Sequence, residues 1–337
     1  MRKKEAGMPE SPSESLSGSP QESPRNAKIE DRRTRRMKAR ERSWHIFTAV
    51  VLVLALVLAL VTAYARARGE EKVRQELTSG SLPRSERGTN GIMILCYHRI
   101  LRDTAATTVS KALSNNRQLH DYALSYSDFE SQMNYLREHK IQVITLERMT
   151  AMLRKGKKVN RQYAVITFDD FDQTVYDNAY PLLKKLKMPF SVFIVSAITG
   201  EYDKGSKMAT WSEIKQLSRD PLVSVGAHTH DMHYQINNRS ALTWPDMYEP
   251  FTQDYRSFQK SLRAELGKET IYFAYPYGQS TTRTQHFLTQ RGMITFGLDG
   301  GVLTNAQITD RNVLKTPLSR VLVGESSWNK TVKPWIR

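Results

Sequence analysis

Cysteine is nearly absent from this chain, since Cys96 is the only one in 337 residues. A single thiol excludes an intramolecular disulfide, so no disulfide framework holds the fold together. Cys96 ends the apolar run at 92–96, where a small thiol is expected to pack in the core. For a domain outside the cell, this shortage fits a bacterial surface without oxidative folding machinery better than a eukaryotic secreted protein.

Large apolar side chains are almost absent from residues 1–43, which are rich in Ser, Pro, Glu and Arg. A segment of this composition cannot bury enough surface to fold. We therefore expect residues 1–43 to form a disordered basic tail on the cytoplasmic side of a membrane.

Charge is missing altogether from residues 44–65, which are mostly Val, Leu and Ala. This run is long enough to cross a hydrocarbon core of roughly 30 Å and predicts a single transmembrane anchor. The arginines and lysine at 32–42 favour a cytoplasmic N-terminus and an extracellular remainder, although Arg66 and Arg68 make the charge asymmetry modest. A cleaved signal peptide ending at 63–65 is the alternative, but the apolar run exceeds the usual length of its hydrophobic region.

The net charge of +16 is shared between the two parts of the chain, because residues 1–68 carry +7 and the remainder +9. A basic extracellular surface suits anionic wall polymers or anionic lipid headgroups. No basic motif interleaved with aromatic residues is present, so nucleic acid is not expected as a partner.

Residues 66–90 contain Gly, Ser, Pro and mixed charge, which predicts a stalk, and the folded domain is expected at 91–337. There, apolar strands alternate with amphipathic helices, an α/β pattern. About seven parallel strands are expected, which favours a distorted (β/α) barrel. Ser127 and Glu130 predict a capping box for the first helix, and residues 101–124 an insertion that is either a lid or a mobile loop. The expected strands are 92–97, 163–168, 190–195, 222–227, 271–274 and 294–298, and the expected helices are 128–140, 174–186, 251–266 and 284–291.

Asp169 and Asp170 follow a hydrophobic strand, at the end where barrel and open-sheet enzymes place their chemistry. Adjacent side chains on a strand point to opposite faces, so both serve one site only if the chain bends there. Asp170, His228 and His233 would be three ligands of a catalytic divalent metal with an open position, provided that the histidine segment curls as a loop. Asp169 is then free as a base. A second possibility pairs His228 with His230 on one face of a continuing strand.

A turn after a later strand contains Tyr275, Pro276, Tyr277 and Gly278. Its tyrosines are expected to line a sugar-binding groove, and a backbone N–H in the turn is placed to donate to an oxyanion. His98 follows the first strand of the domain. Because histidine titrates near neutral pH, His98 is a candidate proton donor for a departing amine.

These motifs, in this order, resemble the NodB-type polysaccharide deacetylases of carbohydrate esterase family 4 over roughly residues 91–323. The resemblance implies a distorted (β/α) barrel. It also implies a divalent metal, zinc first with cobalt or nickel as alternatives, held by Asp170, His228 and His233. Asp169 would be the base.

The departures from that family pattern indicate a branch. Phe171 replaces the usual Gly, the histidines are spaced by five, Phe273-Ala274 stands where an Arg is usual, and no C-terminal Leu-x-x-His motif is present. The branch that deacetylates poly-β-1,6-N-acetylglucosamine is similar in its histidine spacing, in its Phe-Ala-Tyr-Pro turn and in an N-terminal Tyr-His. That similarity implies that His98 takes the place of the missing C-terminal acid. Asp310 and Arg320 are further polar candidates without an assigned place.

The resemblance therefore implies metal-dependent N-deacetylation of an extracellular N-acetylglucosamine polymer, with poly-β-1,6-N-acetylglucosamine as the favoured one. With the predicted anchor and the shortage of cysteine, we expect a single-pass enzyme of a bacterial cell surface, in a Gram-positive organism. A polysaccharide synthase is a candidate partner. The alternatives are a deacetylase of peptidoglycan or another exopolysaccharide, and an inactive polysaccharide-binding relative in which Phe171 narrows the cleft.

Overall fold

The computed structural model describes residues 44–63, 82–105, 107, 122–203 and 205–337, and the chain divides into two units at Arg68. In the first unit the described residues form one helix, Trp44–Ala63, which is long and apolar enough to cross a membrane. The predicted tail at 1–43, most of the predicted stalk and most of the insertion at 101–124 lie outside the described residues.

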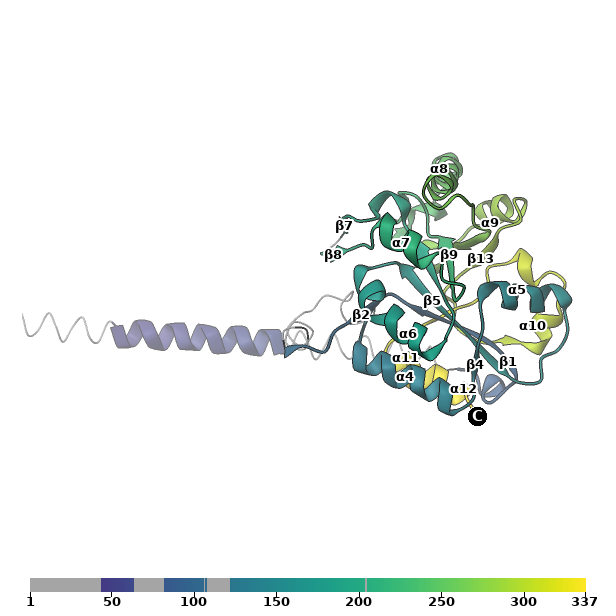
Figure 1. Cartoon of the computed structure of the whole chain (residues 1–337). Coiled ribbons are helices and arrows are strands. Elements are labelled where there is room, and N and C mark those ends of the chain that lie inside the picture. The colour runs from purple at the N-terminus through teal and green to yellow at the C-terminus, as the bar shows by residue number, and fades with distance from the viewer. Residues whose placement is uncertain (1–43, 64–81, 106, 108–121, 204) are drawn as a thin grey trace, which may run out of the picture. The chain divides into compact units, whose positions relative to one another are not determined.

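The second unit is built on a curled sheet with the strand order β13-β12-β9-β6-β5-β1-β14 (Figure 1). All neighbours on this path are parallel except β14, so the carboxyl ends of the parallel strands share one end of the sheet. The main strands are β1 (Gly91–Tyr97), β4 (Gln142–Val143), β5 (Gln162–Asp170), β6 (Phe190–Ile194), β9 (Val223–Ala227), β12 (Tyr272–Ala274), β13 (Ile294–Phe296), β14 (Leu303–Thr304) and β15 (Val321–Leu322). The expected α/β barrel is confirmed in a curled, partly open form.

A segment near the C-terminus closes this curled sheet on one side. Leu318 forms a parallel bridge with Phe296 of β13, and β15 pairs in parallel with β1. The backbone N–H of Val323 then donates to the carbonyl of Cys96 at 2.8 Å. The gap between β13 and β1 is therefore spanned by residues 318–323 and not by a regular eighth strand.

Helices cover the sheet in three groups, as Figure 1 shows: α4, α6, α11 and α12 on one side, α7, α8 and α9 on another, and α5 with α10 at the third. Alternate side chains of a strand point to opposite faces of the sheet, so each strand contributes to two cores. Met93 and Leu95 of β1 belong to one apolar cluster, and Ile92 and Ile94 belong to the other. The bounds are α4 (Tyr126–Glu138), α5 (Leu146–Lys155), α6 (Tyr180–Leu186), α7 (Trp211–Leu217), α8 (Tyr248–Leu266), α9 (Thr282–Thr289), α10 (Asn305–Thr309), α11 (Glu325–Ser327) and α12 (Lys333–Trp335). The small paired strands are β2 (Arg99–Leu101), β3 (Ala123–Ser125), β7 (Tyr202–Asp203), β8 (Ser206–Lys207), β10 (Gln235–Ile236) and β11 (Arg239–Ser240).

The predicted capping box at Ser127 is wrong. The N-cap of α4 is Ser125, whose hydroxyl accepts from the backbone N–H of Asp128 at 3.0 Å. The backbone N–H of Ser127 instead donates to the Asp103 carboxylate at 2.8 Å. The sequence offers two serines near the start of this helix. Because Ser127 is bound to Asp103, Ser125 is the one that caps the helix.

The predicted boundary of the folded domain at Gly91 is also wrong, because earlier residues already pack against the domain. Leu82 is 2% exposed and belongs to the main core. The carboxylate of Glu86 accepts from the backbone N–H of Val302 at 3.1 Å, and the carbonyl of Thr89 accepts from the Trp335 indole at 3.0 Å. Residues 82–90 are therefore part of the fold at the amino end of β1.

Candidate metal centre and active site

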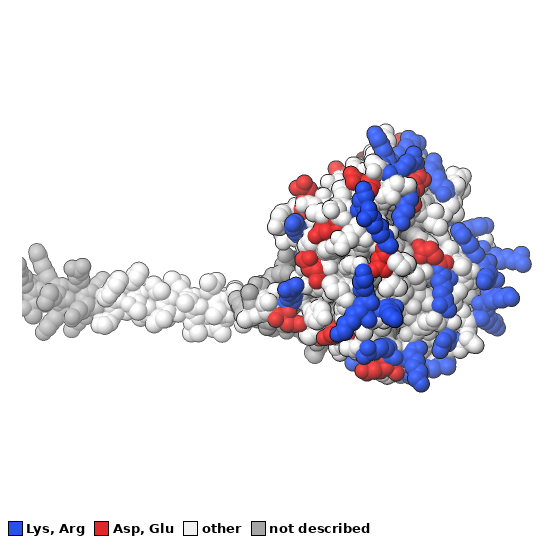
Figure 2. Space-filling view, viewed as in Figure 1, with Lys and Arg blue, Asp and Glu red and all other residues white. Residues whose placement is uncertain are grey.

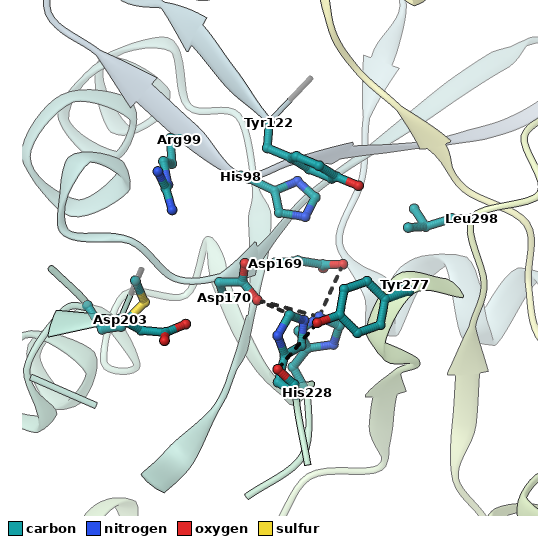
Figure 3. A pocket seen from close by; sticks show the side chains of 11 residues that line it. His98, Arg99, Tyr122, Asp169, Asp170, Asp203, His228, Tyr277 and Leu298 are labelled. Atoms are coloured by element: carbon teal, nitrogen blue, oxygen red, sulfur yellow. Dashed lines mark hydrogen bonds and ion pairs between the residues drawn. The ribbon is translucent and has the colours of Figure 1, made fainter. Parts of the chain in front are cut away.

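The two carboxylates of the Asp pair reach one pocket because β5 bends where they stand. Asp170 has φ 63° and Phe171 has φ 60°, so the chain leaves the strand through two left-handed residues. Both Asp169 and Asp170 line the same pocket (Figure 3). The bend that the sequence required is present.

Phe171 occupies a position where glycine is favoured, since a positive φ costs energy for a residue with a bulky side chain. Its ring is 1% exposed and belongs to the main apolar core, and it does not line the pocket. Burial of an aromatic ring offsets the backbone cost. The expectation that Phe171 narrows the cleft is therefore wrong.

His228 begins the histidine loop directly after β9 and is held in one orientation. Its Nδ1 lies 2.8 Å from the carbonyl oxygen of Ala274, and because a carbonyl only accepts, Nδ1 donates. The Nε2 atom then presents its lone pair toward Asp170, at 3.6 Å from Oδ1. Burial lowers the pKa of His228 to about 4, so the ring is neutral near pH 7, the form that binds metals.

The histidine loop itself is held by Asp254 of α8, which the sequence did not single out. Its two carboxylate oxygens accept from the backbone N–H groups of His230 and Asp231, each at 2.7 Å. The ring of His230 points elsewhere, with Nδ1 at 2.8 Å from the hydroxyl of Ser196. The alternative metal pair of His228 and His230 is therefore not formed.

Asp170, His228 and His233 come together as a set of possible metal ligands. One donor atom from each lies within 4.8 Å of the others, and the Nε2 of His233 is 3.3 Å from Asp170 Oδ1. That oxygen is buried without a hydrogen-bond partner. A buried carboxylate oxygen without a donor, facing two imidazole nitrogens, fits a cation better than it fits an apolar or neutral neighbour.

Asp169 is engaged differently, by a cation from the segment that closes the sheet. The guanidinium of Arg320 donates to its two oxygens at 2.6 and 2.7 Å, and Arg320 Nε donates to the carbonyl of Gly297 at 3.0 Å. Burial alone would raise the pKa of Asp169, but Arg320 and then His228 hold it well below the usual range of a carboxyl group. Asp169 is thus ionised at any working pH.

Cys96, His98 and Asp169 form a second group of close ligand atoms. Arg320 already binds both Asp169 oxygens, so this group suits a metal less well than the first. His98 lines the pocket with its ring edge-on to Tyr122, and its Nδ1 is buried without a hydrogen-bond partner. Burial lowers the pKa of His98.

The predicted sugar-binding turn contributes one residue to the pocket. Tyr277 lines it, stacks on the ring of His233 with centroids 4.9 Å apart and has φ 59°. Tyr275 and Pro276 are buried, and the Tyr275 hydroxyl donates to Gln285 at 2.9 Å. Gly278 does not line the pocket either, and a Cβ there would approach Leu298 to 2.6 Å. The groove-lining role predicted for Tyr275 is therefore wrong.

Five further residues line the pocket that the sequence had not marked. They are Arg99, Tyr122, Asp203, Met208 and Leu298. Arg99 comes shortly after the predicted strand 92–97 and Leu298 ends the predicted strand 294–298, so their position was the available signal. Tyr122, Asp203 and Met208 are not next to any predicted strand, and the sequence offered no such signal for them. Of the two C-terminal candidates, Arg320 reaches the site, whereas Asp310 is exposed and accepts from the backbone of Asn312.

Asp254→Asn is expected to weaken metal binding without removing any ligand. An amide is neutral and presents only one acceptor oxygen, so one of the two loop N–H groups loses its acceptor and the other keeps only a neutral one, which costs about 1.5–3 kcal/mol. Loss of such outer support typically lowers metal affinity by about 10- to 100-fold. Competition with a chromophoric chelator measures the affinity, with the exposed Asp246→Asn as control. Unchanged affinity in Asp254→Asn would contradict the role assigned to this carboxylate.

Comparison with known proteins identifies the family. A family model described as polysaccharide deacetylase matches residues 156–295. IcaB from Ammonifex degensii superposes with a TM-score of 0.63 at 30% identity, over 73% of this chain and 97% of that one. The chain belongs to the polysaccharide deacetylase family. As a polysaccharide deacetylase it is an enzyme, and the resemblance drawn from its motifs is confirmed.

Two curated relatives are named as N-deacetylases, and a further solved structure shares the fold. The poly-beta-1,6-N-acetyl-D-glucosamine N-deacetylase of Staphylococcus aureus strain MRSA252 is 29% identical over 248 residues, covering 73% of this chain and 83% of the relative. The protein of the same name from Staphylococcus epidermidis is 25% identical over 247 residues, with the same shares covered. A de-N-acetylase from Aggregatibacter actinomycetemcomitans shares the fold, with a TM-score of 0.56 at 20% identity over 71% of this chain and 99% of that one.

Proposed function

We propose that this deacetylase removes N-acetyl groups from an extracellular polymer of N-acetylglucosamine, specifically poly-β-1,6-N-acetylglucosamine, in a metal-dependent reaction. The observation that carries the metal dependence is the unpaired Asp170 Oδ1 facing the Nε2 atoms of His228 and His233. The substrate is supported by the names of the staphylococcal relatives, which match most of the domain.

Asp170, His228 and His233 would hold the divalent ion, with zinc preferred and cobalt or nickel as alternatives. When bound, such an ion supplies Lewis-acid polarisation of the acetyl carbonyl and lowers the pKa of a water. The open side of the ligand set faces the pocket, where Tyr277 stacks on His233 and offers an aromatic face to a sugar ring.

Two residues outside the proposed ligand set, Asp169 and His98, transfer protons. Asp169 is ionised and stands beside the ligand set, so it accepts the proton of the water that attacks the acetyl carbon. His98 lies in the same pocket, and in its protonated form it delivers a proton to the departing amine nitrogen and becomes neutral. Arg320 keeps Asp169 in place and charged, and does not itself exchange a proton.

The helix Trp44–Ala63 supports a single-pass anchor, because 20 residues of α-helix span about 30 Å. We place the catalytic domain on the extracellular side of a bacterial cell membrane, in a Gram-positive organism. A polysaccharide synthase in the same membrane is the partner that would supply the polymer.

Metal removal gives the direct test. The purified chain, treated with dipicolinate, is expected to stop releasing acetate from poly-β-1,6-N-acetylglucosamine and to recover with added zinc, cobalt or nickel. Asp170→Ala is expected to lose the ion and roughly a thousandfold in rate, since the ion supplies several kcal/mol of transition-state stabilisation. Asp231→Ala is the matched control, because it removes an exposed carboxylate from the same loop. Undiminished acetate release by Asp170→Ala would overturn the metal assignment.

The substrate is tested by digesting the purified polymer and purified peptidoglycan side by side. Faster acetate release from peptidoglycan would replace the proposed substrate. An inactive polysaccharide-binding protein is distinguished by metal analysis of the purified chain, since such a relative is expected to bind no ion. The inactive alternative was favoured by the expectation that Phe171 narrows the cleft. Because Phe171 is buried in the core, that expectation no longer supports it.

A further inference from the structure

Charge is distributed unequally between the two ends of the barrel. In Figure 2 Lys and Arg gather over α5 and α10, on the right of the view, while much of the acidic surface lies toward β7 and β8 on the left. The right-hand end carries the amino ends of β1 and β5, and the pocket lies at their carboxyl ends. The basic end is therefore the end away from the site.

The most concentrated part of this surface is the end of α5 together with the loop that leads to β5, residues 154–161, which we call the basic connection. It contains five exposed cations and no acid, and the sequence has no Asp or Glu from residue 148 to residue 168. Among the described residues, no carboxylate forms an ion pair with any of the five. The five are Arg154, Lys155, Lys157, Lys158 and Arg161.

Helix capping accounts for only part of this charge. Cations in the last turn of a helix interact favourably with its dipole, which explains Arg154 and Lys155 at the end of α5. Lys157, Lys158 and Arg161 lie beyond the C-cap residue, Gly156, where that effect has ended. Three exposed cations in one short loop are therefore left without a role inside the domain.

The chain enters the domain at this same end. The backbone N–H of Gly91, at the start of β1, donates to the carbonyl of Arg161, and the C-terminal Arg337 donates from its backbone N–H to Gln162. Leu82, the first described residue of the domain, is buried in the main core, and the nearby Glu86 accepts from the backbone N–H of Val302. The described residues that precede β1 thus lie at the same end of the sheet as the basic connection.

We propose that the basic connection docks on the anionic lipid surface of the membrane that holds the chain's own anchor, with the catalytic pocket turned away from that surface. The inference rests on the proposed anchor. Residues 64–81 can extend to about 60 Å, far beyond the radius of gyration of about 18 Å expected for a domain of this size. A connecting segment of this length does not by itself fix which face of the domain meets the membrane. We infer that the charge of the basic connection determines that face.

Each Lys or Arg near an anionic membrane contributes roughly fivefold to binding, and the effect vanishes beyond a Debye length. Docking by the basic connection would hold the pocket open to a polymer on the outer side. It would also keep the acidic pocket end away from anionic lipid, where like charges repel.

The test uses the full chain in vesicles, with a fluorophore on a single new cysteine, since Cys96 is buried. Asn160→Cys places the probe in the basic connection, and Ser212→Cys places it at the start of α7, toward the pocket end. Spin-labelled lipid is expected to quench the probe at 160 in vesicles of phosphatidylcholine with phosphatidylglycerol, and much less in phosphatidylcholine alone. The probe at 212 is expected to stay unquenched in both.

Lys157→Glu with Lys158→Glu is expected to lower the ratio of docked to undocked domain at least about twentyfold, to the level seen in neutral vesicles. Arg256→Glu with Lys260→Glu changes the net charge equally on α8 and is expected to leave the quenching unchanged. Acetate release from soluble oligosaccharide should persist in both variants, which shows that the domain is folded.

Equal quenching at 160 in neutral and anionic vesicles, or equal quenching at 160 and 212, would overturn the docking. So would tighter binding of inorganic polyphosphate than of anionic vesicles, which would assign the surface to a soluble anionic polymer. Flotation with neutral vesicles reports the anchor by itself. If the chain fails to float there, the anchor is wrong, and flotation with anionic vesicles still decides whether the basic connection binds lipid.

Discussion

Asp169→Asn is expected to lower kcat for acetate release by about 10²- to 10⁴-fold, the range that loss of a general base produces. The amide keeps the shape of the side chain, so the bound metal should be retained at wild-type stoichiometry. The same change leaves the buried guanidinium of Arg320 without a charged partner. Removing one member of a buried ion pair costs about 3–5 kcal/mol of unfolding free energy.

A double variant separates these two effects. In Asp169→Asn with Arg320→Met the unpaired cation is gone, and an apolar side chain fills its place, so much of the lost stability should return. Catalysis should not return, because the base is still missing. Recovery of activity in the double variant would mean that Asp169 acts through folding alone, and near wild-type activity of Asp169→Asn would exclude it as the base.

Arg320→Met alone is expected to lower the free energy of unfolding at neutral pH by about 3–5 kcal/mol, as measured by chemical denaturation. Arg320 is fully buried and binds both oxygens of Asp169, and without it the carboxylate is desolvated and unpaired. Arg311→Met is the control, because Arg311 is exposed in the same C-terminal region and should change stability by less than about 0.5 kcal/mol.

The pH dependence of this loss follows from the pKa of Asp169. In the wild type that pKa lies below the unfolded value of about 3.9, so the stabilisation is present above that pH and fades as pH falls toward the folded pKa. In Arg320→Met the largest cause of the lowering is gone, so the pKa of the buried Asp169 is expected to be higher than in the wild type. The gap in stability between the two proteins should therefore widen from about pH 4 to pH 7. A gap that stays constant over this range would contradict the ion pair as its source.

Much of the fold could be predicted because its signals are local. The apolar runs of β1, β5 and β6 are buried on both faces, which gives the continuous pattern read from the sequence. The carboxylates and the histidine loop follow such runs, and parallel strands bring their carboxyl ends to one edge. That Asp170, His228 and His233 come together could therefore be predicted from spacing and strand ends.

What could not be predicted depends on contacts between distant segments. Arg320 lies 151 residues from Asp169 in the sequence, on a segment whose pairing with β1 is only two residues long. Nothing near either residue specifies that contact. Tyr275 is a different case, because strand alternation places it on the same side as Phe273, with ring centroids 5.2 Å apart in the core. The sequence therefore contained the signal that Tyr275 is buried. Tyr277 does not follow the same alternation, because its positive φ takes the chain out of the extended conformation.

The closing segment at 318–323 gives the enzyme a definite order of maturation. Every other strand of the sheet, together with the proposed metal ligands and Asp169, precedes it in the chain, so a polypeptide made from its N-terminus exposes all of them first. Until Arg320 arrives, Asp169 has no cation beside it and the curled sheet is open between β13 and β1. Catalytic competence is therefore gained only once the closing segment has been made, and chains that terminate before it are expected to be inactive.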